Sequence, residues 1–227
     1  MSKVLVIFKN RGIGDICVLV SSLHEVSRKI GEPVTVLAQK NTQAEAIFKD
    51  DPHVSEVIEL DEKGFFNIIK KIKSKKFDQS YIYSDSIRLF LITKLSGIKE
   101  NFHYKFFSKK GKNFFKTAKE FTEKILDTKI DSQSKIYCNK NDIEEAKRKF
   151  SISDKTKNIV CGISASGHTK RWDVNNYIKL FENLNLKFQC KFFLAGGLND
   201  DDLIKKVTSS SIGNRCTSFS TMKIGET

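Results

Sequence analysis

Proline and glycine are scarce in this sequence, with 2 prolines and 12 glycines among 227 residues. Hydrophobic residues make up 39% of the chain and occur in strand-length and helix-length runs. This composition excludes a collagen-like or Gly/Pro-rich disordered protein and leaves little room for a flexible linker. A chain of this length can bury the core of one large or two modest domains.

Long apolar runs and several common motifs are also absent. No run reaches the ~20 residues that span a bilayer, and the apolar start at residues 4–8 is too short for a signal-peptide core. We therefore expect a cytoplasmic protein. The five cysteines form no C-x-x-C pair, which argues against a disulfide framework or a structural zinc. P-loop, G-x-S-x-G and H-E-x-x-H motifs are missing, so hydrolase and metalloprotease functions are disfavoured.

Positive charge is in excess: 40 Lys and Arg stand against 27 Asp and Glu, a net charge of +13. Such a balance favours polyanionic partners such as nucleotide diphosphates, anionic lipid headgroups or nucleic acid. The alternative is a lysine-rich solvated surface, because the lysines are distributed through helical segments such as residues 67–76. The charge is compatible with a substrate at a membrane surface without demonstrating one.

Strand and helix patterns alternate along the chain. Residues 3–8 predict a buried parallel strand, residues 16–30 have helical apolar spacing, and Gly31 stands where a glycine ends a helix. A second strand at 33–38 completes a βαβ unit. The same reasoning predicts further helices at 42–49, 65–75, 87–95, 118–126, 142–150, 174–184 and 201–207, and further strands at 54–60, 79–83, 159–163 and 190–194. The predicted fold class is α/β, with two Rossmann-like domains.

The polar segment 151–157 separates two βαβ patterns, so we predict an N-terminal domain at residues 1–153 and a C-terminal domain at 154–227. The second domain has too few predicted strands for a doubly wound sheet and is expected to be incomplete. Residues 101–116 show no clear periodicity.

The first candidate site is the turn Gly12-Ile13-Gly14-Asp15, which follows a strand and precedes a helix. Ligands bind at this position in α/β folds, where free N–H groups favour anions. Asp15 alternatively caps the helix. Cys17 replaces the third glycine of a dinucleotide fingerprint and the second strand ends at Gln39, so an NAD-dependent oxidoreductase is disfavoured.

The second candidate site is the loop at residues 164–172, again between a strand and a helix, with Asp173 as the expected cap. Lys170 or Arg171 can neutralise a diphosphate, and nearby hydroxyls can bond its oxygens. The hydroxyls considered are those of Ser164 and Ser166. The alternative is a solvated polar loop whose Trp172 covers the core.

The third strand-end loop, residues 195–202, is acidic. Its carboxylates can bond a ribose hydroxyl or cap the following helix, and capping is the favoured interpretation. Because adjacent carboxylates at a helix start point in different directions and no second acidic cluster stands out, we predict no required metal.

Taken together, several short motifs resemble the bacterial lipopolysaccharide heptosyltransferases and their relatives in glycosyltransferase family 9. The resemblance covers nearly the whole chain. Its carriers are Val4-Leu5-Val6-Ile7, Gly14-Asp15, residues 52–58 (PHVSEVI), Phe77-Asp78, residues 162–172 with Lys170-Arg171-Trp172, and Leu194-Ala195-Gly196-Gly197.

The resemblance implies a GT-B-type enzyme with two facing Rossmann-like domains, in which the first binds the acceptor and the second binds a nucleotide sugar. Asp15 would be the catalytic base of an inverting, metal-independent transfer, with Gly12 and Gly14 in the acceptor-side loop. Asp200 would bind the nucleoside, although the family's acidic residue could equally align with Asn199. The implied diphosphate-binding residues are Ser164, Ser166, Thr169 and Lys170.

The resemblance also implies partners and a location. The nucleoside-diphosphate sugar, expected to be an ADP-linked heptose, is a co-substrate, and no separate cofactor is expected. The acceptor would be a lipid-linked saccharide at the inner face of the cytoplasmic membrane, bound by a monomer with no nucleic-acid partner. Relatives continue to a Asp-Ser/Thr-Gly-x-x-His-like donor-site segment that has no counterpart here, so we expect a truncated chain. The alternative function is an inactive fragment or binding module that retains the first domain.

Overall fold

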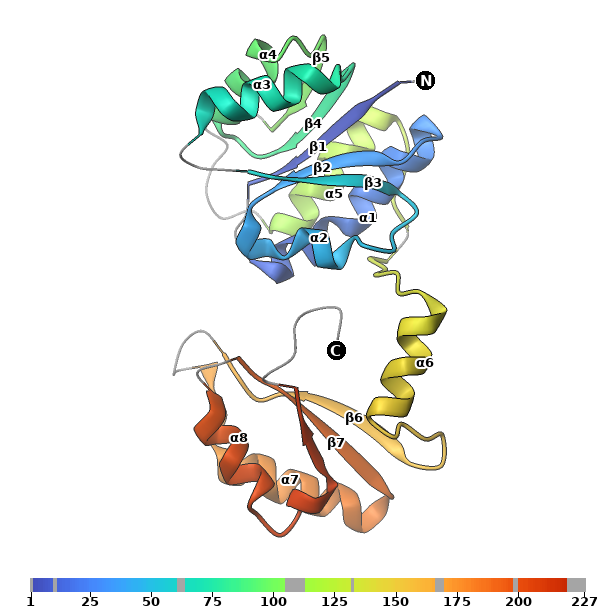
Figure 1. The fold of residues 1–227 in the computed structure, drawn as a ribbon, viewed down its shortest axis with the longest axis vertical. Helices are drawn as coiled ribbons and strands as arrows, with labels where there is room; N and C mark the ends of the chain where they lie inside the picture. The colour runs from blue at the N-terminus through green and yellow to red at the C-terminus, as the bar shows by residue number, and fades with distance from the viewer. Residues whose placement is uncertain are drawn as a thin grey trace. The chain divides into compact units, whose positions relative to one another are not determined.

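The computed structural model describes residues 2–9, 12–60, 64–104, 113–131, 133–165, 170–197 and 200–219. The chain forms two compact units, residues 1–138 and 139–227 (Figure 1). This division falls before the helix α6 (Lys140–Lys149), whereas the sequence-based boundary at 153/154 falls after it. The helix belongs with the second unit because Phe150, at its end, packs against Phe219 with ring centroids 4.9 Å apart.

The first unit is built on one parallel sheet. Its strands are β1 (Val4–Phe8), β2 (Val34–Ala38), β3 (Val54–Glu59), β4 (Gln79–Tyr83) and β5 (Glu100–His103). They are ordered β3-β2-β1-β4-β5, so the chain moves outward from β1 and then returns to its other side. This reversal defines a doubly wound α/β sheet, as the sequence predicted.

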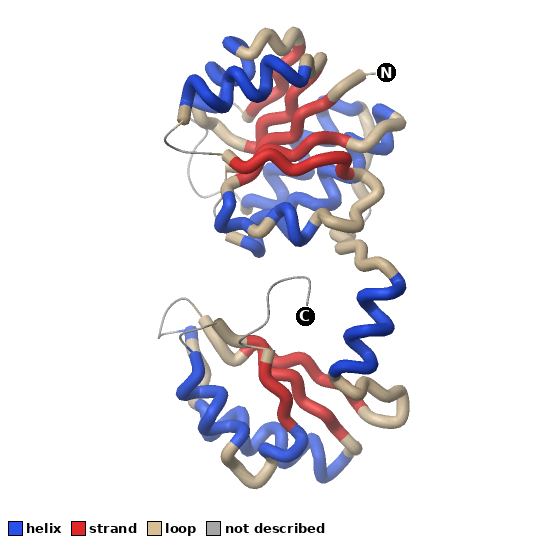
Figure 2. The backbone as a smooth tube through the Cα atoms, viewed as in Figure 1, coloured by secondary structure: helices blue, strands red, loops and turns tan. Residues whose placement is uncertain are grey.

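Helices cover both faces of this sheet (Figure 2). One face carries α1 (Ile13–Ile30), α2 (Ala44–Ile47) and α5 (Phe114–Leu126), and the other carries α3 (Phe65–Lys75) and α4 (Ile87–Leu95) (Figure 1). Apolar residues of the strands meet those of α3 and α4 in a buried core, because strand side chains alternate between faces. The members of this core include Leu5, Ile7, Leu37, Ile58, Ile68, Ile72, Leu89 and Ile92.

The second unit repeats the same logic on a smaller scale. Its strands β6 (Lys157–Gly162), β7 (Cys190–Ala195) and β8 (Cys216–Ser218) are parallel and ordered β6-β7-β8. The helices α7 (Val174–Lys187) and α8 (Asp201–Thr208) follow β6 and β7. Phe181 of α7 stacks on Phe192 of β7, with ring centroids 4.3 Å apart, at the centre of this core.

Several element boundaries differ from the sequence-based predictions. The helix predicted at 42–49 is a 3-10 turn (Lys40–Thr42) followed by the short α2, because Gln43 between them adopts a left-handed φ of 55°. The strands β5 and β8 were not predicted, since both are short and rich in polar residues. Gly31 does end α1, with a φ of 79°. Among the described helices, none is long and apolar enough to cross a membrane.

A buried polar cluster joins α1 to the segment before β3. His24 Nε2 lies 2.7 Å from Asp51 Oδ2, and both side chains are buried. His53 Nδ1 lies 3.0 Å from the Ser27 hydroxyl, and its ring centroid is 4.5 Å from that of His24. Tyr137 packs on both rings, with centroids 5.7 Å from His24 and 6.2 Å from His53.

This cluster makes the stability of the first unit depend on pH. Burial, followed by the nearby charges of His24 and Arg28, lowers the pKa of His53 against an opposing effect of Asp51. The unfolded chain therefore binds more protons than the folded one as pH falls below about 6.5. We expect the free energy of unfolding to reach its highest value above that pH and to decline below it. We expect the decline to be smaller in His53→Gln.

Urea titrations across about pH 5 to 8, which spans the ordinary histidine pKa, measure this dependence. His103→Gln, on β5 and outside the cluster, is the matched control. If the free energy of unfolding of His53→Gln declines with falling pH as steeply as that of the unaltered chain, His53 is not the group responsible.

Candidate functional site

The reversal of strand order places two loops side by side at the carboxyl edge of the first sheet. β1 and β4 pair in parallel, and their last residues, Phe8 and Tyr83, are register partners. The segment after β1 leads into α1, and the segment after β4 leads into α4. Crevices at such reversals are the usual ligand sites of open α/β sheets.

Asp15 lies in the first turn of α1 and is partly exposed. The helix begins at Ile13 with Gly12 as its N-cap, so Asp15 is not the N-cap itself, but it does cap the helix, as the third residue of a capping box. The carboxylate reaches back, and its Oδ2 accepts a hydrogen bond of 3.1 Å from the Gly12 N–H. Within the described ranges, its second oxygen accepts no hydrogen bond. That oxygen is available to an incoming group at a positive helix terminus.

The two glycines of this turn differ in what surrounds them. A Cβ at Gly12 would lie 3.1 Å from Asp15 Oδ2, so a side chain there would crowd the carboxylate. A Cβ at Gly14 would meet nothing within 4 Å, and Gly14 is exposed. Gly12 thus permits the position of Asp15, whereas nothing in the described structure requires a glycine at 14.

Sequence reasoning missed two features of the same edge. Ser84, Asp85 and Ser86 follow β4, and the Ser86 N–H donates to the Ser84 hydroxyl over 3.1 Å. A hollow of about 510 Å³ lies beyond the ends of β2 and β3. Its charged lining residues are Lys40, Glu45, Lys49 and Glu59. The signal for the first feature was a Ser-Asp-Ser sequence directly after a strand, whereas the hollow left no pattern.

In the second unit, a salt bridge joins the loops that follow β6 and β7. Arg171 Nη2 lies 3.1 Å from Asp200 Oδ1, and Arg171 Nε donates to the Ala165 carbonyl over 3.1 Å. Asp200 Oδ2 accepts from the Gly197 N–H over 2.8 Å. Only 2% of Asp200 is exposed. One buried carboxylate, together with its arginine partner, thus ties the loop after β6 to the loop after β7.

Capping was the favoured interpretation for this acidic loop. Asp200 stands at the N-cap of α8, but its side chain makes no hydrogen bond to that helix. Its own N–H donates to the Gly197 carbonyl over 3.0 Å, and this turn directs the carboxylate toward the glycines. Hydrogen bonding from Ser164, then from Gly197, and the charge of Arg171 hold the pKa of Asp200 below its usual value. Its assignment to the nucleoside stays a prediction.

The two cations of this loop have different surroundings. Arg171 is engaged by Asp200 and Ala165, whereas Lys170 is exposed and makes no ion pair or hydrogen bond within the described ranges. Ser164 is exposed close by in sequence. Ser166 and Thr169, also predicted to bind the diphosphate, lie outside the described residues. Asp173 caps α7 as predicted, accepting from the Asn175 N–H over 2.8 Å.

The described parts of the chain contain no group of three His, Cys, Asp or Glu residues that could hold a metal ion. The described cysteines are unpaired.

Solved structures with similar folds include three of one type. Escherichia coli ADP-heptose lps heptosyltransferase II aligns with 99% of this chain over 74% of its own, at 15% identity and a TM-score of 0.73. The glycosyl transferase family 9 protein of Veillonella parvula DSM 2008 aligns with 92% over 66% of its own, at 15% identity and a TM-score of 0.75. E. coli heptosyltransferase WaaC with ADP aligns with 98% over 75% of its own, at 12% identity and a TM-score of 0.69.

No protein-family model matches the sequence, and no curated protein matches it significantly. At 12–15% identity, these likenesses show the fold alone. The chain has the two Rossmann-like units of this class of glycosyltransferase, which confirms the predicted resemblance at the level of the fold. It spans just under two thirds of the Veillonella protein.

The salt bridge provides a test of the second unit. Asp200→Asn keeps the size of the side chain but removes its charge, and we expect the unfolding free energy to fall by about 1–3 kcal/mol. Trp172, the single tryptophan, reports this unit in urea titrations followed by fluorescence.

Asp201→Asn is the matched control, because it removes an exposed carboxylate from the same helix start and should change stability by less than about 1 kcal/mol. Equal effects of the two substitutions would show that the salt bridge contributes nothing specific.

Proposed function

We propose that this chain is a glycosyltransferase that moves a sugar from a nucleoside-diphosphate donor to a saccharide acceptor with inversion at the anomeric carbon. The observation that carries the proposal is Asp15, a partly exposed carboxylate in the first turn of α1 at the strand-order reversal. The fold likeness to heptosyltransferases, one of them solved with ADP, supports the same chemistry. We further propose an ADP-linked heptose as donor and a lipid-linked, lipopolysaccharide-core-type saccharide as acceptor.

In the proposed reaction, the acceptor hydroxyl binds to the first unit, and Asp15 accepts its proton. The hydroxyl oxygen forms a bond to the anomeric carbon as the bond from that carbon to the diphosphate oxygen breaks, and the electron pair leaves with the nucleoside diphosphate. The Gly12 N–H, bonded to Asp15 Oδ2, orients the carboxylate so that its other oxygen faces the substrate.

The leaving diphosphate is assigned to the second unit. Lys170 neutralises its developing charge, and the Ser166 and Thr169 hydroxyls donate hydrogen bonds to its oxygens. The Ser164 hydroxyl, which bonds Asp200 in the free chain, donates to the diphosphate by exchanging that partner. Arg171 and Asp200 hold the loop edge in place rather than contributing charge, because they engage one another. Asp200 is assigned to the nucleoside, but its carboxylate is buried and bonded by Arg171 and Gly197. A nucleoside would therefore reach this carboxylate by displacing one of those partners. No metal or separate cofactor takes part.

The role of Asp15 is tested by Asp15→Asn, which keeps the size of the side chain but cannot accept the proton. We expect kcat for sugar transfer to fall about 10²- to 10⁴-fold, since that is the usual contribution of a general base. Stabilisation of the chain by ADP should not change. Glu120→Gln, an exposed carboxylate on α5, is the control and should retain activity. Transfer at the normal rate by Asp15→Asn would remove this residue from the mechanism.

The role of Lys170 is tested without turnover. Lys170→Met should weaken ADP binding about 10- to 100-fold, because a charge-assisted hydrogen bond contributes ~1.5–3 kcal/mol. Thermal shifts and Trp172 fluorescence measure that affinity next to the loop. Lys187→Met, an exposed lysine at the end of α7, should have no effect. No stabilisation of the unaltered chain by any nucleoside diphosphate would favour a binding module that lacks a donor site.

A further inference from the structure

The outer surfaces of α3 and α4 combine exposed apolar side chains with positive charge. Phe66 is 79% exposed on α3, and Leu91 and Leu95, one helical turn apart on α4, are 45% and 55% exposed. Large exposed apolar side chains on two adjacent helices mark a candidate contact surface. We name this surface the α3/α4 face and define it by Phe66, Lys70, Lys73, Leu91, Lys94 and Leu95.

These two helices lie side by side. The Arg88 guanidinium of α4 lies 5.9 Å from the ring centroid of Phe65 on α3, and the Ser96 hydroxyl donates to the Ile69 carbonyl over 3.3 Å. Their opposite surfaces are buried in the core of the first unit, through Ile68 and Ile72 on α3 and Leu89 and Ile92 on α4. The exposed residues are therefore not needed for packing within the unit.

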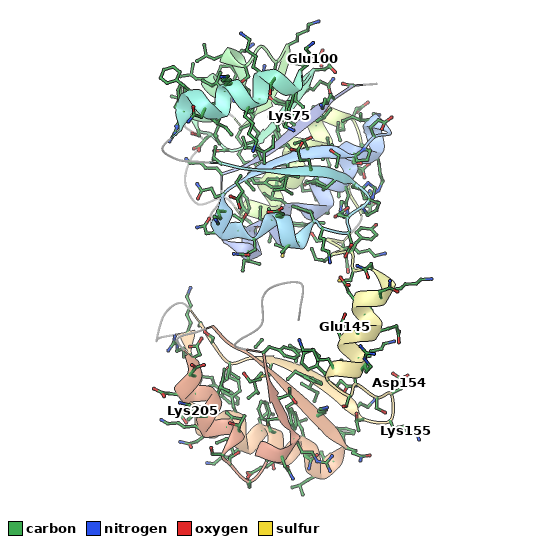
Figure 3. All side chains as sticks on the ribbon, in the orientation of Figure 1. Lys75, Glu100, Glu145, Asp154, Lys155 and Lys205 are labelled. Carbon is green, nitrogen blue, oxygen red and sulfur yellow. The ribbon has the colours of Figure 1, made fainter. Side chains whose placement is uncertain are left out.

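Charge on these helices has a single sign. Residues 65–76 contain five lysines, residues 86–99 contain Arg88, Lys94 and Lys99, and neither segment contains an aspartate or a glutamate. Lys75, labelled in Figure 3 on α3, pairs with Glu56 of the edge strand β3 over 2.6 Å. Lys70, Lys73 and Lys94 are exposed beside the apolar residues.

We propose that the α3/α4 face binds the surface of an anionic phospholipid bilayer. A bilayer offers what both components of the face require: anionic headgroups for the lysines, and an acyl boundary for Phe66, Leu91 and Leu95. A second copy of the chain would bring like charges together, and nucleic acid would leave the leucines without a role.

These helices lie on the opposite face of the sheet from α1, the helix that carries Asp15 (Figure 1). A bilayer bound to the α3/α4 face therefore does not cover the first turn of α1. The inference goes beyond the proposed transfer, because lipid binding requires neither donor nor acceptor.

The test is cosedimentation of the full chain with vesicles of phosphatidylcholine, with and without phosphatidylglycerol. Binding is expected only to the vesicles that contain phosphatidylglycerol and should weaken as salt shortens the Debye length. The triple variant Lys70→Gln/Lys73→Gln/Lys94→Gln should bind on the order of 100-fold more weakly, because each lysine near an anionic surface contributes a factor of about five. The double variant Leu91→Ser/Leu95→Ser should bind at least about tenfold more weakly.

Matched controls carry the same changes at other exposed positions. Lys116→Gln/Lys205→Gln/Lys206→Gln removes three lysines from α5 and α8, and Leu186→Ser/Phe188→Ser removes two exposed apolar residues from the second unit. Both controls should bind nearly as well as the unaltered chain.

Equal binding to neutral and anionic vesicles, or an equal loss in the controls, would overturn the proposal. So would unchanged vesicle binding by Leu91→Ser/Leu95→Ser together with a change of oligomeric state in light scattering, since that result assigns the face to a second copy. ADP stabilisation, measured in parallel, should be unaffected by the face variants, so failure of lipid binding and failure of the proposed transfer are separate results.

Discussion

The parallel pairing of β1 with β4 is the interaction on which the first unit depends. Because the chain moves outward through β2 and β3 and then returns to the other side of β1, the helices before the return (α1 and α2) and those during or after it (α3 and α4) cover opposite faces of the sheet. The same pairing brings the segments after Phe8 and Tyr83 together at one edge. A buried hydrogen bond of 2.7 Å between Tyr83 and Thr122 of α5 adds to the packing on the α1 side. Site and core therefore have one topological origin.

In the second unit, a salt bridge orders the loops that follow the strands. Its strand-end loops are polar and carry few apolar side chains with which to hold their own conformation. The Arg171–Asp200 contact and the Gly197 hydrogen bond supply that order, and a Cβ at Gly196 would lie 3.1 Å from Ile204 and 3.4 Å from Asp200. The loop edge is consequently preorganised by residues that lie beside, rather than among, the predicted ligand-binding ones, a common arrangement in binding sites.

Much of the fold was predictable from the sequence because its signals are local. The apolar runs of β1 and β4, the helical spacing of α3 and α4, and Gly31 each specify an element without reference to the rest of the chain. β5 left no such signal, since Glu100 and Asn101 are polar and the strand lies at the edge of the sheet. The start of α1 was placed too late because its N-cap is a glycine rather than one of the usual capping side chains.

The candidate site was predictable only in part. Strand-end position makes Asp15 and the loop at Lys170 candidates, because ligand binding at that edge is a property of the fold, and their roles stay predictions. The distinction between Lys170 and Arg171 was not predictable, since it depends on a partner 29 positions away along the chain that only the parallel register of β6 and β7 brings near. The sequence suggested that lysines were scattered, whereas the structure shows α3 and α4 to carry them without any carboxylate.

The packing of Tyr137 against His24 and His53 has a consequence for chain entropy. Tyr137 is held by the first unit, and Asn139 caps α6 of the second by accepting from the Asp142 N–H over 2.8 Å. Ordering the Tyr137 side chain against the two histidine rings costs rotamer entropy, and the Asn139 cap orders the residue that precedes α6. The entropy cost of ordering this segment is therefore offset in two places, by ring contacts within the first unit and by a helix cap within the second.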